Sequence, residues 1–427
     1  MDSGIAMVAA FLGLILFGLP ISFSSFLAVV LYIFLQGKLP GILVPQRMFV
    51  TIDSYPLLAI PLFMLAGELM NSGGITKRIV NFSSKLVGHI TGGLAHITIL
   101  ASMIFAGMSG SCAAAGASVG SMLIPALKRD GYAPDFAVAV TASAAVMGPV
   151  IPPSIIMVLY AACTGTSVGK MFLGGVIPGI VLGLFLMCVA YIISRKRGYK
   201  PQLEHRPPVR EVFGAFVSSF PALMLPVIIV GGIFGGFFTA TEAGVIGVVY
   251  ATIVGFCTRE LKIHMIKGIF LNASKVTANL LFLMGGGALL GWVLTSLQAP
   301  QFMTRELLGI TTDPTMLILI MVGFVLFLGC FMVDVSIIPI LAPLMLPVII
   351  QAGIDPIQFG VVICITAVTG NLTPPVGGLL FVTSAIGQVP VMKTSKAVLP
   401  FLAAIIVVIV LCALMPSLVT FLPNLLM

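Results

Sequence analysis

Two proline pairs interrupt long apolar segments of this chain, and they restrict its fold more than any other feature. Residues 148–154 read GPVIPPS, and residues 370–376 read GNLTPPV. Proline has no N–H, and its ring pushes away the carbonyl group four residues earlier. In hydrocarbon an unpaired carbonyl group costs several kcal/mol unless something binds it. The carbonyl groups predicted to be released by Pro152, Pro153, Pro374 and Pro375 are those of Gly148, Pro149, Gly370 and Asn371.

Each proline pair alone is also compatible with a plain kink in a membrane helix. Their recurrence in both halves of the chain favours another interpretation, because paired helix breaks are typical of a transporter's binding site. We therefore predict two broken transmembrane helices, over 135–163 and 356–386, whose unpaired backbone groups face a polar cavity.

The composition places the chain in a membrane. Of its 427 residues 59% are hydrophobic and 8% are charged, whereas a soluble domain has about 25% charged residues. Apolar runs of about 20 residues recur, so we predict an all-α polytopic membrane protein with about 10–12 crossings. The net charge of +8 then indicates basic cytoplasmic loops rather than nucleic-acid binding. The scattered cysteine and histidine residues show no zinc spacing, disulfide framework or catalytic arrangement, which argues against an enzyme.

An internal repeat relates the two halves of the chain. An offset of 222 residues superimposes nine glycine and proline positions without a gap, and chance does not explain so many matches. The pairs are Gly107 with Gly329, Pro125 with Pro347, Gly131 with Gly353, Pro134 with Pro356, Gly148 with Gly370, Pro152 with Pro374, Pro153 with Pro375, Gly165 with Gly387 and Pro178 with Pro400.

The charges of equivalent loops indicate that the second copy is inverted. Lys128 and Arg129 make one loop basic, whereas its counterpart at 350–355 has no lysine or arginine. Because basic loops stay in the cytoplasm, equivalent loops lie on opposite sides of the membrane. The predicted units are a first inverted repeat at 1–194, a cytoplasmic linker at 195–211 and a second inverted repeat at 212–427.

Each repeat also contains a candidate re-entrant hairpin, at about 94–127 and about 316–350. The first lies between two basic loops, and a single crossing would leave one of these loops outside. Its middle, 107–114, has small residues that allow close packing. The alternative is an ordinary span rich in glycine and alanine. With two hairpins, 16 of the 21 lysine and arginine residues lie in the cytoplasm and both termini lie in the periplasm.

Asp334 is the strongest single candidate for a functional side chain. It lies at the predicted tip of the second hairpin, 330–336, and a carboxylate near mid-membrane costs about 3 kcal/mol or more. A helix N-cap is the alternative role for this position, and the two roles are compatible. Glu68 and Glu242 are weaker candidates, because solvation near a helix end at the membrane surface explains each charge.

The tips and breaks together offer oxygen atoms for two Na⁺ ions, as unwound helices do. Packing of small residues is the alternative for the first set. The first predicted sodium site comprises Ser109, Ser111, Gly148, Ile151 and Pro153. The second comprises Gly329, Met332, Asp334, Thr369, Gly370 and Thr373. The side chains predicted to face an anionic substrate, beside helix ends, are Ser109, Asp334, Asn371 and Thr373.

Three stretches carry a resemblance that extends over the whole chain. They are AIPLFMLAG at 59–67, the tip GMSGSCAAAG at 107–116 and the PPS of the first break at 152–154. The chain resembles the large membrane subunit of TRAP transporters, the DctM type. The resemblance implies a tripartite importer of the bacterial inner membrane, driven by Na⁺ and moving in an elevator fashion. Its partners would be membrane lipid, a separate small four-helix membrane subunit and a periplasmic substrate-binding protein. The substrate would be an organic acid, with sialic acid favoured over a C4-dicarboxylate.

Two other kinds of function stay open at this point. A stand-alone ion-coupled carboxylate transporter or antiporter would use the same architecture without partner proteins. An ion channel or a structural membrane scaffold would show neither saturable uptake nor a fixed Na⁺ stoichiometry.

Overall fold

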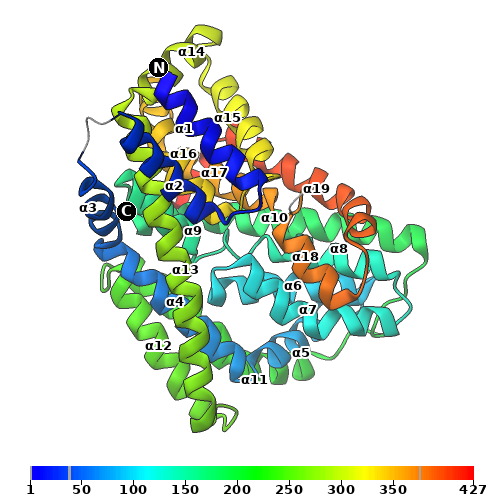
Figure 1. The fold of residues 1–427 in the computed structure, drawn as a ribbon. Coiled ribbons are helices and arrows are strands. Elements are labelled where there is room, and N and C mark those ends of the chain that lie inside the picture. Colours follow the sequence, from blue (N-terminus) through cyan, green and yellow to red (C-terminus); the bar gives the residue numbers. More distant parts are fainter. Residues whose placement is uncertain (1, 37–39, 375–376) are drawn as a thin grey trace.

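The computed structural model describes residues 2–36, 40–374 and 377–427, and helices are the only regular elements in these ranges (Figure 1). The predicted role of Pro375 concerns a residue outside the described ranges. Six of the described helices are long and apolar enough to cross a membrane, or seven spans if α3 is joined to the bent helix that follows it. This number is below the predicted 10–12 because the broken helices and most hairpin arms are shorter pieces.

The first part of the chain forms helices before any repeat begins. The segment over α3 and α4 bends by 64°, and α5 is a short amphipathic helix. The elements are α1 (Asp2–Leu16), α2 (Ile21–Gln36), α3 (Leu43–Ile52), the 3-10 helix η1 (Tyr55–Leu58), α4 (Ala59–Ser72) and α5 (Ile75–Val87).

The first repeat unit has a hairpin, a broken helix and a long closing helix. The hairpin is α6 (Gly93–Ser109) with α7 (Cys112–Arg129), the broken helix is α8 (Pro134–Ala145) with α9 (Ile155–Thr164), and α10 (Val168–Arg197) closes the unit. Three helices and a surface helix then follow the linker, namely α11 (Val209–Phe234), α12 (Ala240–Cys257), α13 (Ile263–Ser296) and α14 (Ala299–Ile310).

The second repeat unit copies the first element by element. Its members are α15 (Pro314–Gly329), α16 (Asp334–Gln351), α17 (Pro356–Gly370), α18 (Gly378–Gly387) and α19 (Val391–Leu414), and α20 (Ser417–Leu426) follows. α7 and α16 both have 18 residues, and their first residues are 222 apart. The hairpins and breaks predicted from the sequence are confirmed at these positions.

The two broken helices pack in opposite directions. The end of α18 meets the start of α8, where a Cβ atom on Gly387 would overlap Val138. At the other end of the pair, the Tyr160 hydroxyl of α9 donates a hydrogen bond to the Pro356 carbonyl at the start of α17, at 2.9 Å. The start of each broken helix therefore lies beside the end of the other, as inverted repeats require.

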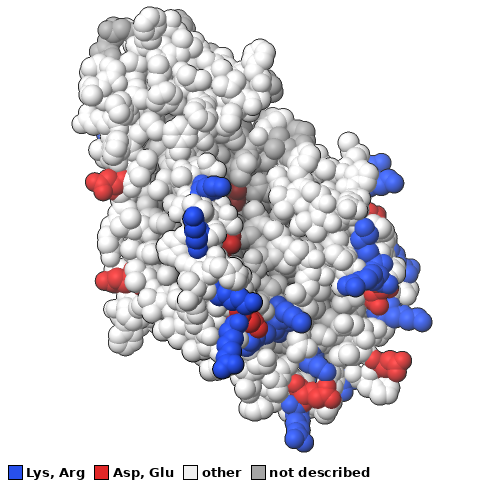
Figure 2. All heavy atoms as spheres, turned by 60° about the horizontal axis from the view of Figure 1, so that its bottom comes forward, with Lys and Arg blue, Asp and Glu red and all other residues white. Residues whose placement is uncertain are grey.

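The basic connections gather on one side of the molecule. Lys85 of α5 pairs with Glu211 at 2.6 Å, and Lys128 donates a hydrogen bond to the Gly387 carbonyl at 3.0 Å. The linker joins the same group, because the Tyr199 hydroxyl accepts a hydrogen bond from a backbone N–H of the α7–α8 loop. Figure 2 shows Lys and Arg side chains over the lower part and right edge of one face, with hardly any on its upper lobe. This segregation agrees with the charge pattern of a membrane protein.

Candidate functional site

The first hairpin turns at Gly110 and Ser111, inside the predicted tip. Gly110 has φ 62°, a left-handed conformation that favours glycine. Ser111 caps α7, because its side-chain oxygen accepts a hydrogen bond from the Ala114 N–H at 3.4 Å. The Ser109 hydroxyl donates to the Ser111 carbonyl at 3.5 Å. The turn therefore presents oxygen atoms without bulky side chains.

The first break packs directly against this tip. Residues 146–154 form turns and bends between α8 and α9. A Cβ atom on Gly148 would lie 2.7 Å from the Ser111 carbonyl oxygen, and one on Gly110 would lie 2.7 Å from the Pro153 carbonyl oxygen. Both positions therefore require glycine for the two backbones to approach this closely. The residues of the first predicted sodium site that meet here are Ser109, Ser111, Gly148 and Pro153.

The two carbonyl groups that the prolines of the first break are predicted to release differ in their hydrogen bonding. The Pro149 carbonyl accepts a hydrogen bond from the Ser154 hydroxyl, so the chain itself replaces the bond that proline removes. The Gly148 carbonyl accepts no hydrogen bond from the residues that the structure describes. Ile151 belongs to the same break, but its side chain packs against Gly179 of α10. One of the two carbonyl groups predicted to be released therefore has no hydrogen-bond partner among the described residues.

The second tip and the second break meet at two glycine residues. A Cβ atom on Gly370 would lie 2.5 Å from the Cα of Gly329 and 2.9 Å from its carbonyl oxygen. The Cys330 thiol donates a hydrogen bond to the Thr373 hydroxyl at 3.5 Å across the same contact. Three residues of the second predicted sodium site, Gly329, Gly370 and Thr373, are thus in contact.

Most oxygen atoms of this second cluster already have partners within the chain. The Gly370 carbonyl accepts hydrogen bonds from the Thr373 N–H at 2.9 Å and from its hydroxyl at 2.7 Å. The Thr369 hydroxyl donates to the Ile365 carbonyl at 2.6 Å. Met332 is buried. A cation here would have to replace these bonds, as it would at the Ser111 carbonyl of the first cluster, which accepts hydrogen bonds from the Ser109 hydroxyl and the Ala115 N–H.

Asp334 lies in the first turn of α16 and is 5% exposed. The cap position belongs to Val333, so Asp334 sits where a carboxylate interacts favourably with the helix dipole. The side chain of Asn371 interacts with the Asp334 carboxyl group. The same Asn371 donates a hydrogen bond from Nδ2 to the Cys112 Sγ at 3.6 Å. Asn371 therefore links the tips of both hairpins.

A cavity of about 300 Å³ lies among both tips and both breaks. Of the four side chains predicted to face a substrate, Asp334 and Asn371 line this cavity, whereas Ser109 and Thr373 are not among its lining residues. The lining residues are Met64, Gly110, Ser111, Cys112, Ala113, Pro149, Ile155, Ile156, Val276, Leu280, Val333, Asp334, Val335, Asn371, Gly378 and Leu379.

Four helices begin at this cavity, two from each repeat unit. Their first residues, Cys112 of α7, Ile155 of α9, Asp334 of α16 and Gly378 of α18, all line it. The first turn of a helix has N–H groups without intrahelical partners, and the helix dipole makes this end positive. Four such ends around one space form a site suited to a negatively charged group.

Sequence reasoning missed the walls of the cavity. Met64 of α4 and Val276 and Leu280 of α13 line it, but nothing in their local sequence distinguishes them from other apolar residues. Only packing between distant segments identifies them. Cys112 is the missed lining residue that lies nearest to a predicted one, because it directly follows Ser111 of the predicted tip.

Neither of the two weaker acidic candidates is among the described residues that line the cavity. Glu242 forms a capping box with Thr239 at the start of α12, where its carboxylate accepts a hydrogen bond from the Thr239 N–H at 2.8 Å. Glu68 is partly buried within α4. The structural role of Glu242 explains its position without a transport function.

Paired hairpins, paired helix breaks and a central cavity define this chain as a membrane transporter. The family described as tripartite ATP-independent periplasmic transporter, DctM component, matches residues 8–418. The chain belongs to this family and is a TRAP transporter large permease, not an enzyme.

Individual relatives agree with this assignment. The chain is 40% identical to the C4-dicarboxylate TRAP transporter large permease protein DctM of Pseudomonas aeruginosa, over 88% of both chains. It is 37% identical to the sialic acid TRAP transporter large permease protein SiaM of Vibrio cholerae, over 98% of both chains. The solved structure of the Alcanivorax borkumensis YdaH transporter shares the fold, with a TM-score of 0.65 over 88% of this chain and 87% of that one at 14% identity.

Proposed function

We propose that this chain is the membrane-embedded large subunit of a Na⁺-coupled importer of an organic acid in the bacterial inner membrane. The single observation that carries the proposal is the convergence of four helix starts and both hairpin tips on one cavity. Such a site attracts a carboxylate without a lysine or arginine side chain.

Na⁺ coupling is supported by the first tip and break. The Gly148 backbone lies against the Ser111 carbonyl group, and the Gly148 carbonyl has no hydrogen-bond donor among the described residues. Unwound backbone of this kind coordinates Na⁺ in other transporters with broken helices. Asp334 and the second cluster would supply a second ion site after the Thr373 hydrogen bonds to Gly370 are exchanged for the cation.

The family supports partner proteins and a location. A tripartite system requires two further components, which we propose to be a small four-helix membrane subunit and a periplasmic substrate-binding protein. The gathered basic connections would face the cytoplasm, and both termini would face the periplasm. Transport would move the hairpins and broken helices as one body against the remaining helices, in an elevator fashion.

The two relatives described above are named for different acids, sialic acid and C4-dicarboxylates. Sialic acid, favoured by resemblance, and a C4-dicarboxylate therefore both belong among the acids to be tested. The shared chemical feature is a carboxylate, which is the group that the four helix starts would bind.

The decisive experiment reconstitutes the large subunit, the small subunit and the binding protein in liposomes with an inward Na⁺ gradient. We expect saturable uptake of an organic acid that stops when Na⁺, the small subunit or the binding protein is omitted. Uptake that persists without both partner proteins would identify a stand-alone transporter instead. A flux that does not saturate would identify a channel.

A further inference from the structure

We propose that the cavity selects a monocarboxylate with an apolar body, bound with its carboxylate at the Ser111 end. This inference rests on the proposed function, because it names the substrate class of the same cavity. It differs from both acids for which the relatives described above are named.

The walls between the two tips are apolar. The polar side chains among the described lining residues are those of Ser111, Cys112, Asn371 and Asp334. A polyhydroxylated acid would bury more hydroxyl groups than these side chains and the nearby backbone can bond, and each unpaired group weakens binding. An apolar body instead gains about fourfold in affinity for each buried CH₂ group. The apolar walls are Met64, Ile155, Ile156, Val276, Leu280 and Leu379.

The two ends of the cavity carry different side chains, although the repeat gives them similar backbones. The first tip lines it with Gly110, Ser111 and Cys112, which are uncharged. At the second tip the Asp334 carboxyl group already occupies the positive start of α16, beside Val333. A second carboxylate on the substrate would find this helix start already taken, and no lysine, arginine or histidine is among the described lining residues to pair with it. One carboxylate at the starts of α7 and α9 is therefore favoured over two.

The test uses the purified complex of this full-length chain with its small membrane subunit in lipid nanodiscs, in sodium chloride and in choline chloride. Isothermal titration would compare 4-methylpentanoate, succinate, N-acetylneuraminate and the neutral 4-methylpentanamide. We expect 4-methylpentanoate to bind in Na⁺ about tenfold or more tightly than each of the other three. The amide isolates the contribution of the carboxylate, because it has the same body without the charge.

Two tryptophan variants of α13 test where the apolar body of the ligand binds. Leu280→Trp fills the cavity and is expected to weaken binding of 4-methylpentanoate about tenfold or more. Leu271→Trp makes the same change on the same helix at a side chain that is 50% exposed and does not line the cavity. It is expected to leave binding unchanged, and the melting temperatures of both variants report whether each one is folded.

The outcomes that would overturn the inference differ from those that would overturn the proposed function. Tighter binding of succinate or N-acetylneuraminate would overturn the inference and leave the proposed function standing. Equal loss of binding in both tryptophan variants would also overturn the inference, because the cavity would not be the site. Binding of none of the acids in either salt would also overturn the inference, whereas the uptake experiment in liposomes tests the proposed function separately.

Discussion

At the scale of single residues, glycine decides whether the hairpins can reach the breaks. Gly110 and Gly148 lie against backbone atoms where the first hairpin tip meets the first break. Gly329 and Gly370 lie against each other where the second tip meets the second break. No side chain fits between these segments, so the candidate oxygen atoms come together only because the Cβ atoms are absent. The repeat is not followed strictly, since a Cβ atom on Gly107, the counterpart of Gly329, would lie 3.1 Å from Pro226 of α11 and 3.5 Å from the Pro152 carbonyl oxygen of the first break.

Gly370→Ala tests the second contact. The added Cβ would lie 2.5 Å from the Gly329 Cα, so we expect a loss of about 1–3 kcal/mol of stability and of most uptake. Gly323→Ala is the matched control, because a Cβ on this α15 glycine has nothing within 4 Å. Thermal unfolding and uptake measure both variants, and an equally small effect of the two would show that the tip and break are not in contact.

Asp334→Asn tests the buried carboxylate. The change keeps the shape of the side chain and removes its charge, so we expect uptake to fall about 100-fold or more while the folded protein remains in the membrane. Asp53→Asn, at an exposed position, should leave uptake unchanged. Normal uptake by Asp334→Asn would remove this residue from the site.

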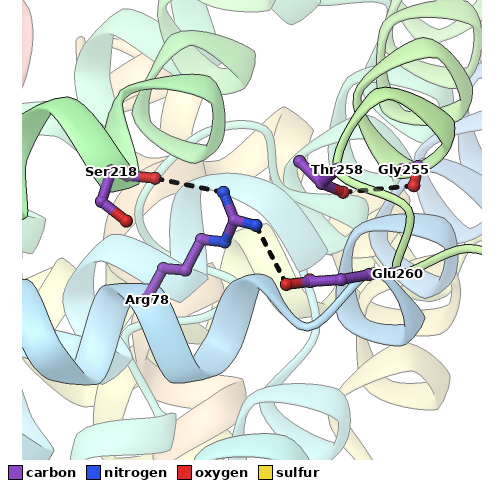
Figure 3. A network of polar contacts seen from close by, with 5 residues as sticks. All are labelled: Arg78, Ser218, Gly255, Thr258 and Glu260. Atoms are coloured by element: carbon purple, nitrogen blue, oxygen red, sulfur yellow. Dashed lines mark hydrogen bonds and ion pairs between the residues drawn. The ribbon is translucent and has the colours of Figure 1, made fainter.

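At the scale of elements, α5 is held at its start by a polar network that the sequence did not reveal. Figure 3 shows Arg78 of α5 between the Ser218 carbonyl of α11, at 3.4 Å, and Glu260 of the α12–α13 connection, at 2.9 Å. The Arg78 and Glu260 side chains are 27% and 34% exposed. This network fixes the helix that leads into the first hairpin to one helix and one connection of the other half.

A double-mutant cycle measures the strength of this link. With Arg78→Gln, Glu260→Gln and the double variant, we expect a coupling of about 0.5–1 kcal/mol in the free energy of unfolding, because the pair is partly screened by solvent. Lys85 and Glu211 form a comparison pair that is more open, at 28% and 52% exposure. Its coupling should be smaller, and the reverse order would contradict the proposed anchoring role of Arg78.

At the scale of the whole molecule, the inverted repeats make a prediction about sidedness. Arg129 ends α7 and Gln351 ends α16, at equivalent positions 222 residues apart. In a background without the native cysteines, Arg129→Cys is expected to react with a membrane-impermeant maleimide only from the cytoplasm, and Gln351→Cys only from the periplasm. Labelling of both from one side would contradict the inversion.

Much of this architecture was predictable because its causes are local. Apolar length indicates a membrane helix, and Pro152 or Gly110 acts on the backbone within a few residues of itself. The repeated spacing of such residues then predicts both hairpins and both breaks, at boundaries close to those of α7 and α16.

The chemistry of the cavity was decided by packing between distant segments. Asn371 lies beside Cys112 and Asp334, and Leu280 comes to the same space from α13, although these residues are far apart in the chain. Likewise, the carbonyl group of Gly148, which has no hydrogen-bond partner among the described residues, and the satisfied one of Gly370 follow identical proline patterns. Local backbone effects therefore create the unpaired groups, whereas the neighbours brought in by folding determine which of them a ligand can use.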